Sequence, residues 1–261
     1  MNIVVCIKQV PETTSVKINS DTNTLIREGT KSIINPFDMY AIEEGLRMRE
    51  KFGGKVIAMS MGPPQADEAL REAVSYGVDD AVLLSDRAFA GADTLATSRT
   101  LAKAIGKIED CGLIICGKQA IDGDTAQVGP GIADKMNIPF VAFIRKIREM
   151  NNHTLTVERM MDDGYDVVEL TLPALITVVK DINEPRMPSL RGKMRAKSID
   201  IPVWSLSDLK MSEDQVGLSG SATQVIKMFT PKRSGAREML EGSAKDQASL
   251  LLDKLCDLEL V

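Results

Sequence analysis

Four short runs of apolar residues recur along the first half of the chain, and amphipathic segments separate them. The runs cover residues 3–8, 55–62, 81–86 and 112–117. Because nearly every position in them is apolar, they are typical of strands that are buried on both faces of a parallel sheet. Strands that alternate with helices predict right-handed crossovers, with the helices packed on the sheet faces.

The segments between these runs carry apolar residues three or four positions apart, as helices with one buried face do. We expect helices over residues 37–51, 64–76 and 93–107. Asn35 or Asp38 is placed to cap the first of them, since both side chains can accept a hydrogen bond from a helix N-terminus.

The second half of the chain has a different pattern. Residues 144–180 are expected to form antiparallel strands, with turns at 151–152 and 163–164. Residues 181–197 show no periodicity, and we interpret them as a surface loop. A final helix is expected over residues 235–258, where leucines recur on one face.

Together these patterns predict an α/β fold. We expect a parallel sheet flanked by helices, Rossmann-like and suited to nucleotide binding, with added antiparallel strands and an extended C-terminal arm. The nucleotide-binding domain is expected over residues 1–200, and the arm and final helix over residues 201–261. Within the first domain, residues 15–18 and 24–27 are expected to pair as a hairpin.

Composition narrows the class of protein. Of the 261 residues, 44% are apolar, 26% are charged and 4% are aromatic, which is the profile of a soluble α/β protein. The net charge is −5 and the basic residues are scattered, so we expect no nucleic-acid partner. The apolar runs are far shorter than a membrane span, so we expect no membrane insertion.

The cysteines and the first residues bear on location. Cys6, Cys111, Cys116 and Cys256 lack the spacing of metal ligands, so no metal site is expected. The chain begins with a strand-like run and not with the basic and small-residue regions of a signal peptide. We therefore expect a reduced, cytoplasmic protein.

Ligands of parallel α/β sheets bind at the carboxyl ends of the strands. Four loops are expected there, over residues 8–14, 62–65, 85–94 and 117–129. The fourth is the most unusual, because glycines and acidic residues are concentrated in it between a buried strand and a helix.

The fourth loop matches neither the Walker phosphate loop nor the dinucleotide fingerprint. A helix that starts there would still offer free N–H groups and a positive dipole end to a phosphate. Thr125 and Gln127 can add side-chain hydrogen bonds. Asp122 and Asp124 would repel phosphate, so we expect them to bind ribose hydroxyls, cap the helix or brace the loop. An ordinary capped turn fits the spacing equally well.

The segment "GKQAIDGDTAQVGPGIA" resembles the nucleotide-binding segment of the beta subunit of electron transfer flavoproteins. The likeness covers nearly the whole chain and includes, in order, "VCIKQVPETTSVKI", "INPFDMYAIEEGLRMREK", "VIAMSMGPPQADEALREAVSYGVDDAVLLSD" and "LPALITVVKDINEPRMPSL". It implies a heterodimer with an alpha subunit that carries most of one flavin site. It also implies that a second adenine nucleotide binds to the sheet of this chain.

The resemblance further implies which residues contact that nucleotide. They lie at two strand ends, at a helix start and along the fourth loop: Cys6, Asn35, Pro36, Phe37, Asp38, Met61, Gly117, Lys118, Gln119, Ala120, Ile121, Asp122, Gly123, Asp124, Thr125, Ala126, Gln127 and Val128. All of these positions fall at the expected ligand edge. Cys6 is also explained by packing alone, with its backbone near the adenine.

In this family the second nucleotide is either a structural AMP or a redox-active FAD. The loop over residues 86–98 resembles that of the two-FAD, electron-bifurcating members. In that reading Arg87 pairs with the pyrophosphate, Phe89 or Ala90 lies near the flavin ring, and Asp93 and Thr94 bond the flavin or cap a helix. Without the resemblance, Arg87 would be interpreted as a solvated surface charge and Phe89 as a core residue.

The function implied is electron transfer. In the bifurcating reading, NADH gives a hydride to this FAD. One electron then passes to the alpha-subunit FAD and an acyl-CoA-type or other flavin dehydrogenase, and the other to ferredoxin or flavodoxin. The alternative is a plain electron carrier with AMP in this chain. The arm and final helix are expected to grip the alpha subunit.

The resemblance also implies a docking site for the dehydrogenase. Leu190 lies among the basic residues Arg186, Arg191, Lys193, Arg195 and Lys197. An apolar anchor with a basic rim suits a partner surface, and Leu190, Arg191 and Lys193 are the docking residues that we predict. The alternative is that Leu190 packs back onto its own domain.

Overall fold

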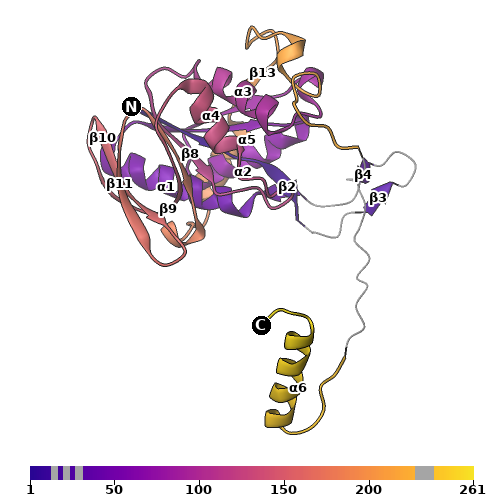
Figure 1. Cartoon of the computed structure of the whole chain (residues 1–261). Coiled ribbons are helices and arrows are strands. Elements are labelled where there is room, and N and C mark those ends of the chain that lie inside the picture. Colours follow the sequence, from indigo (N-terminus) through magenta and orange to yellow (C-terminus); the bar gives the residue numbers. More distant parts are fainter. Residues whose placement is uncertain (13–16, 20–23, 27–31, 227–237) are drawn as a thin grey trace. The chain divides into compact units, whose positions relative to one another are not determined.

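The computed structural model describes residues 1–12, 17–19, 24–26, 32–226 and 238–261. The chain divides into two units, Met1–Ile226 and Lys227–Val261 (Figure 1). Each unit is described by itself.

The first unit is built on one large sheet. Among the described residues its strand order is β11-β10-β9-β12-β8-β1-β6-β7-β13. The strands that pair in parallel are β1 (Asn2–Cys6), β6 (Lys55–Met61), β7 (Asp80–Leu84), β8 (Cys111–Gly117), β9 (Phe140–Met150), β12 (Ala174–Val178) and β13 (Val203–Trp204). Two antiparallel strands, β10 (Thr154–Met160) and β11 (Tyr165–Thr171), extend the sheet beyond β9. The predicted fold class is confirmed. The expectation of antiparallel strands over residues 144–180 is wrong for β12, which pairs in parallel with both β8 and β9.

Helices cover both faces of the sheet. They are α1 (Pro36–Phe52), α2 (Asp67–Tyr76), α3 (Thr94–Ile105), α4 (Val128–Met136) and α5 (Leu190–Ser198), with short 3-10 helices η1 (Pro64–Ala66), η2 (Arg87–Phe89), η3 (Lys180–Ile182) and η4 (Glu213–Gln215). Val5 of β1 belongs to the core cluster that includes Leu46 of α1, whereas its neighbour Val4 belongs to the cluster that includes Leu101 of α3 and Ile132 of α4. Alternate residues of one strand thus serve two cores, which explains why the strand is apolar throughout.

Two small antiparallel pairs lie outside the large sheet. They are β2 (Gln9–Pro11) with β5 (Ser32–Ile34), and β3 (Lys17–Asn19) with β4 (Thr24–Ile26). The second pair corresponds to the predicted hairpin. The turn expected between its strands lies outside the described residues.

The interpretation of residues 181–197 as a loop is wrong in its second part, because α5 begins at Leu190. Ser189 caps this helix, since its hydroxyl accepts a hydrogen bond from the Gly192 N–H at 2.9 Å. A Cβ added to Gly192 would lie 2.1 Å from the carbonyl oxygen of Ser75. The glycine that lowers the helix propensity is therefore required by packing against α2.

The residues that directly follow residue 200 still belong to the first unit. β13 pairs with β7 at the sheet edge, and Leu209 and Val216 are buried. The first unit ends at Ile226, so the boundary that the sequence predicts at residue 200 lies within this unit. The second unit contains α6 (Ala244–Asp257), whose first turn is closed by a capping box between Ser243 and Asp246.

In the described part of the chain, no helix combines the length and the apolar character that crossing a membrane requires. The predicted grip of the last residues on an alpha subunit stays a prediction.

Candidate functional site

A cavity of about 1200 Å³ opens at the carboxyl edge of the parallel strands. Four neighbouring strands contribute their ends to its lining: Cys6, Met61 and Gly117 are the last residues of β1, β6 and β8, and Ser85 directly follows β7. This is the edge at which the alternation of strands and helices predicts a ligand.

Asn35 ties the start of α1 to the loop that follows β8. Its Nδ2 donates to the carbonyl of Gln119 at 2.8 Å, and its Oδ1 accepts from the Ile121 N–H at 3.1 Å. The side chain is buried and makes no capping bond to α1. The expected capping role of Asn35 is therefore wrong, because the amide is used across the cavity edge instead.

Asp38 is buried at the same point. Its Oδ2 accepts a hydrogen bond from the Lys8 N–H at 2.7 Å. Burial raises the pKa of this carboxyl to about 7, against the lowering effect of hydrogen bonds from Asn35 and from the backbone of Lys8 and Gly117. A Cβ added to Gly117 would lie 2.3 Å from Asp38 Oδ1, so a glycine is needed for α1 to approach β8.

The two acidic residues of the loop turn away from the cavity lining. Asp122 Oδ1 pairs with Lys8 Nζ at 2.7 Å, and Asp124 accepts from the Gln119 side chain. Asp124 and Ala126 adopt left-handed backbone conformations, with φ of 53° and 54°. Of the three roles that the sequence left open for these carboxylates, the contacts favour bracing of the loop.

The N-terminus of α4 faces the cavity. Gln127 occupies the N-cap position without a side-chain capping bond, and Val128 and Gly129 line the cavity. Pro130 follows and has no N–H to offer. The first-turn N–H groups that remain are those that an α-helix leaves without intrahelical partners, and they suit an anion.

The third loop also lines the cavity. Phe89 is 5% exposed and lines the cavity beside Ala90, while Arg87 is exposed and has no ion-pair partner among the residues described. Asp93 Oδ1 caps α3 by accepting from the Ala96 N–H at 3.0 Å. Its Oδ2 accepts from both the N–H and the hydroxyl of Thr223, at 2.9 and 3.0 Å.

The family model for the electron transfer flavoprotein domain matches residues 22–209. A beta subunit of electron transfer flavoprotein from Thermoanaerobacterium thermosaccharolyticum is 49% identical over 98% of both chains. The chain belongs to the electron transfer flavoprotein family, as a beta subunit.

Two further relatives of this beta subunit have more specific names. The caffeyl-CoA reductase-Etf complex subunit CarD of Acetobacterium woodii is 46% identical over the full length of both chains. Protein FixA of Bradyrhizobium diazoefficiens is 42% identical over 98% of this chain and 91% of its own. Beta subunits of this family pair with an alpha subunit and work in electron transfer.

Most of the residues predicted to contact the nucleotide are brought together in this beta subunit. Those that line the cavity are Cys6, Asn35, Asp38, Met61, Arg87, Phe89, Ala90, Asp93, Thr94, Gly117, Lys118, Gln119, Ala120, Gly123, Thr125, Ala126, Gln127 and Val128. Those that do not line it are Pro36, Phe37, Ile121, Asp122 and Asp124. Of these five, the first two lie at the start of α1 and the other three lie in the loop that follows β8.

The sequence missed part of the lining. Thr223 and Val225 close one side of the cavity although they lie far along the chain from its loops. Thr223 is held there by Asp93, which lies 130 residues away, and no local sequence signal indicates such a pair.

The predicted docking residues lie on α5. Leu190 is 76% exposed, and Arg191 and Lys193 are exposed as well. Met194, one turn farther along α5, is also exposed, and so is Met187, which precedes the helix. We call Met187, Leu190 and Met194 the docking patch. Leu190 therefore does not pack back onto its own domain.

Proposed function

We propose that this beta subunit holds FAD in the cavity at the carboxyl edge of its sheet and that NADH is its electron donor. The observation that carries the proposal is the size of the cavity together with the residues that line it. Its volume of about 1200 Å³ exceeds the roughly 300–1,000 Å³ of typical small-ligand sites. Its lining includes both the N-terminus of α4 and the loop of Arg87 and Phe89, and its volume gives a dinucleotide room that a mononucleotide would not fill.

The residues present fit such a cofactor. The N–H groups of Val128 and Gly129, with the side chains of Thr125 and Gln127, are placed to bind phosphates and ribose. Lys118 and Arg87 add positive charge along the lining.

The apolar part of the lining suits a flat ring. Phe89 and Leu101 are buried apolar side chains in the wall, and Met61, Ala90 and Val225 line it beside them. The buried side chains of Phe89 and Leu101 offer apolar contact to an aromatic ring system. When bound, FAD supplies the exchange of a hydride for single electrons. The chain needs no acid, base or nucleophile of its own for that exchange, and its task is to hold and orient.

A second candidate is a structural AMP in the same cavity. Asn35, Asp38 and the braced loop form a polar end that is complete without the wall around Phe89. In that case the beta subunit is a scaffold, and electrons pass only through the flavin of the alpha subunit.

The partners follow from the same proposal. The name of the relative from Acetobacterium woodii places that protein in a complex with a CoA-ester reductase. This supports an acyl-CoA-type dehydrogenase as the partner that docks at Leu190. Ferredoxin or flavodoxin is proposed as the acceptor of the second electron, with the complex in the cytoplasm.

The test is anaerobic mixing of the purified heterodimer with NADH, followed by the visible absorbance of flavin. We expect loss of this absorbance, and we expect it to fail in a heterodimer whose beta-subunit cavity is blocked by Gly123→Glu. Equal reduction by NADH in both proteins would show that the flavin reduced by NADH lies elsewhere.

A further inference from the structure

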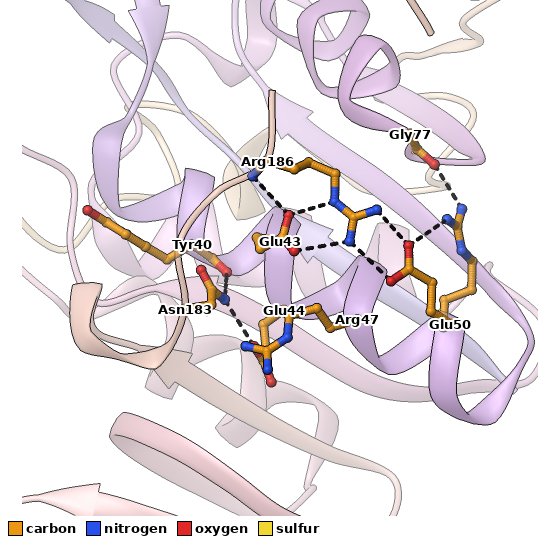
Figure 2. Close-up of polar contacts among 9 residues, drawn as sticks. Tyr40, Glu43, Glu44, Arg47, Glu50, Gly77, Asn183 and Arg186 are labelled. Carbon is orange, nitrogen blue, oxygen red and sulfur yellow. Dashed lines mark hydrogen bonds and ion pairs between the residues drawn. The ribbon is translucent and has the colours of Figure 1, made fainter. Parts of the chain in front are cut away.

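Arg186 joins the segment before α5 to helix α1 through two carboxylates (Figure 2). Its Nε and Nη2 donate to the two oxygens of Glu43 at 2.8 and 3.0 Å. Its Nη1 and Nη2 donate to the two oxygens of Glu50 at 2.6 and 3.2 Å. The backbone N–H of Arg186 also donates to Glu43, at 3.2 Å. We call Arg186, Glu43 and Glu50 the clamp.

The clamp has the features of a strong ion pair and not of an incidental surface contact. Both carboxylates are bound in the bidentate geometry that the planar guanidinium favours. The side chain of Glu43 is only 8% exposed, so removal of Arg186 would leave a buried charge without its partner. The hydrogen bonds raise the pKa of Arg186 and lower the pKa of Glu50, as expected for two groups that stabilise each other's charged form.

Other contacts hold the segment on both sides of the docking patch. Before it, Asn183 Nδ2 donates to the Tyr40 carbonyl at 3.0 Å and to Glu44 at 2.9 Å (Figure 2). After it, Arg71 donates to the carbonyl of Ala196 at 2.8 Å. The backbone of the segment is therefore fixed at its two ends on α1 and α2.

Between these fixed points the side chains of the docking patch make no such contacts with the fold. Met187 follows the clamp directly and is 86% exposed, and Leu190 is three residues farther along. Leu190 begins helix α5, which packs on α2 through Gly192 and Ala196, whereas Met187 lies in the non-helical segment between the clamp and the helix. Ordering that segment before association lowers the entropic cost of binding. The clamp is formed by the residue that directly precedes Met187 in the chain.

We infer that Arg186 is a positioning residue for docking. Its clamp on Glu43 and Glu50 keeps the docking patch in the conformation that binds the dehydrogenase. The inference rests on the proposed docking of an acyl-CoA-type dehydrogenase. The partner surface that fits is an apolar pocket with a carboxylate rim, because Arg191, Lys193 and Lys197 are exposed around the patch.

The physical effect is preorganisation. With the clamp intact, the segment is already ordered in the folded protein. Without the clamp, the segment would lose conformational entropy at each association, and this loss would weaken binding without changing the contacts in the complex.

The experiment uses the complete heterodimer and a purified acyl-CoA dehydrogenase that reduces it. Arg186→Gln and Glu50→Gln are compared with the parent, and Lys55→Gln is the control because it removes an exposed ion pair to Asp80. Glu50→Gln keeps the buried half of the clamp, so it remains informative if Arg186→Gln folds poorly. The readouts are KM and kcat for transfer, and amide hydrogen exchange of residues 187–198.

We expect Arg186→Gln to raise the KM for the partner about tenfold and to leave kcat unchanged, with faster exchange over residues 187–198. Glu50→Gln should show a smaller effect of the same kind, and Lys55→Gln none. Unchanged KM together with unchanged exchange would overturn the inference, as would a change in kcat alone. Faster exchange without a change in KM would make the clamp purely structural and would overturn it too.

Leu190→Ala separates this inference from the docking proposal. It should raise KM without altering exchange, because it removes a contact and not a brace. If Leu190→Ala leaves KM unchanged while Arg186→Gln raises it, the proposed docking anchor is wrong. If only Leu190→Ala raises KM, docking stands and the role of Arg186 is wrong.

Discussion

Asn35 and Gln119 are 84 residues apart in the chain, and the side-chain amide of the first donates to the carbonyl of the second at 2.8 Å. Together with the bond from Ile121 to Asn35, this contact sets the position of the loop that lines the cavity. A buried asparagine with both ends of its amide in use is costly to replace, since each lost partner leaves a desolvated group.

Asn35→Ala is therefore expected to destabilise the fold by about 1–3 kcal/mol and to release the nucleotide bound in this chain. Denaturant unfolding of the heterodimer and the nucleotide retained after gel filtration are the measurements. Asn151→Ala is a matched control, since this asparagine bonds only within an exposed turn. Retention of the nucleotide at the parent level by Asn35→Ala would contradict the role given to the loop.

Asp38 is expected to make stability depend on pH. Its pKa lies near 3.8 in the unfolded chain and at about 7 in the folded one, so the folded state keeps a proton that the unfolded state loses. Stability from this group is complete below about pH 4 and is lost as pH rises through about 7.

Asp38→Asn cannot lose that proton. The variant is expected to show a smaller fall in the free energy of unfolding than the parent between these two pH limits, whatever its absolute stability. Denaturant unfolding of both proteins across the range measures the difference. Parallel pH profiles would show that the Asp38 carboxyl does not titrate as inferred.

Gly123→Glu is expected to exclude the nucleotide. A Cβ at this position meets no atom of the chain within 4 Å, so the substitution does not disturb the fold, while the carboxylate enters a cavity that it lines. Gly164→Glu is the control, because a Cβ there also meets nothing within 4 Å and the turn does not line the cavity. Full nucleotide content in Gly123→Glu, by absorbance of the released cofactor, would place the ligand elsewhere.

Leu190→Ala is expected to weaken dehydrogenase binding by about 2 kcal/mol, which corresponds to roughly 30-fold in Kd. The reason is loss of an exposed apolar anchor that has no packing role in its own fold. Binding measured by surface plasmon resonance tests this, with reduction of the flavin by NADH as the internal control. Equal affinity in the variant and the parent would remove α5 from the docking site.

The strands and the first helices could be predicted from the sequence because burial determines a local pattern of apolar residues. The pattern is continuous in a strand buried on both faces and periodic in a helix buried on one. Val4 and Val5 face different cores, and the run of apolar residues records both. Helix α5 was missed for the opposite reason. Only Ala196 of this helix is buried, and Gly192 is there to fit against Ser75.

The long-range hydrogen bonds that hold the site together could not be predicted from the sequence. Asn35 reads as a helix cap, yet its partners are on another loop. Thr223 reaches Asp93 over 130 residues, and Arg186 reaches Glu43 over 143. Local patterns carry no information on such pairs, and single-sequence reasoning can place only one member of each.

The cofactor content of the purified heterodimer tests the central claim most directly. Acid release followed by chromatographic separation counts FAD and AMP for each alpha-beta pair. The account predicts two FAD and no AMP, since the cavity of this chain has room and lining for a dinucleotide. One FAD and one AMP would contradict it and would make this chain a scaffold.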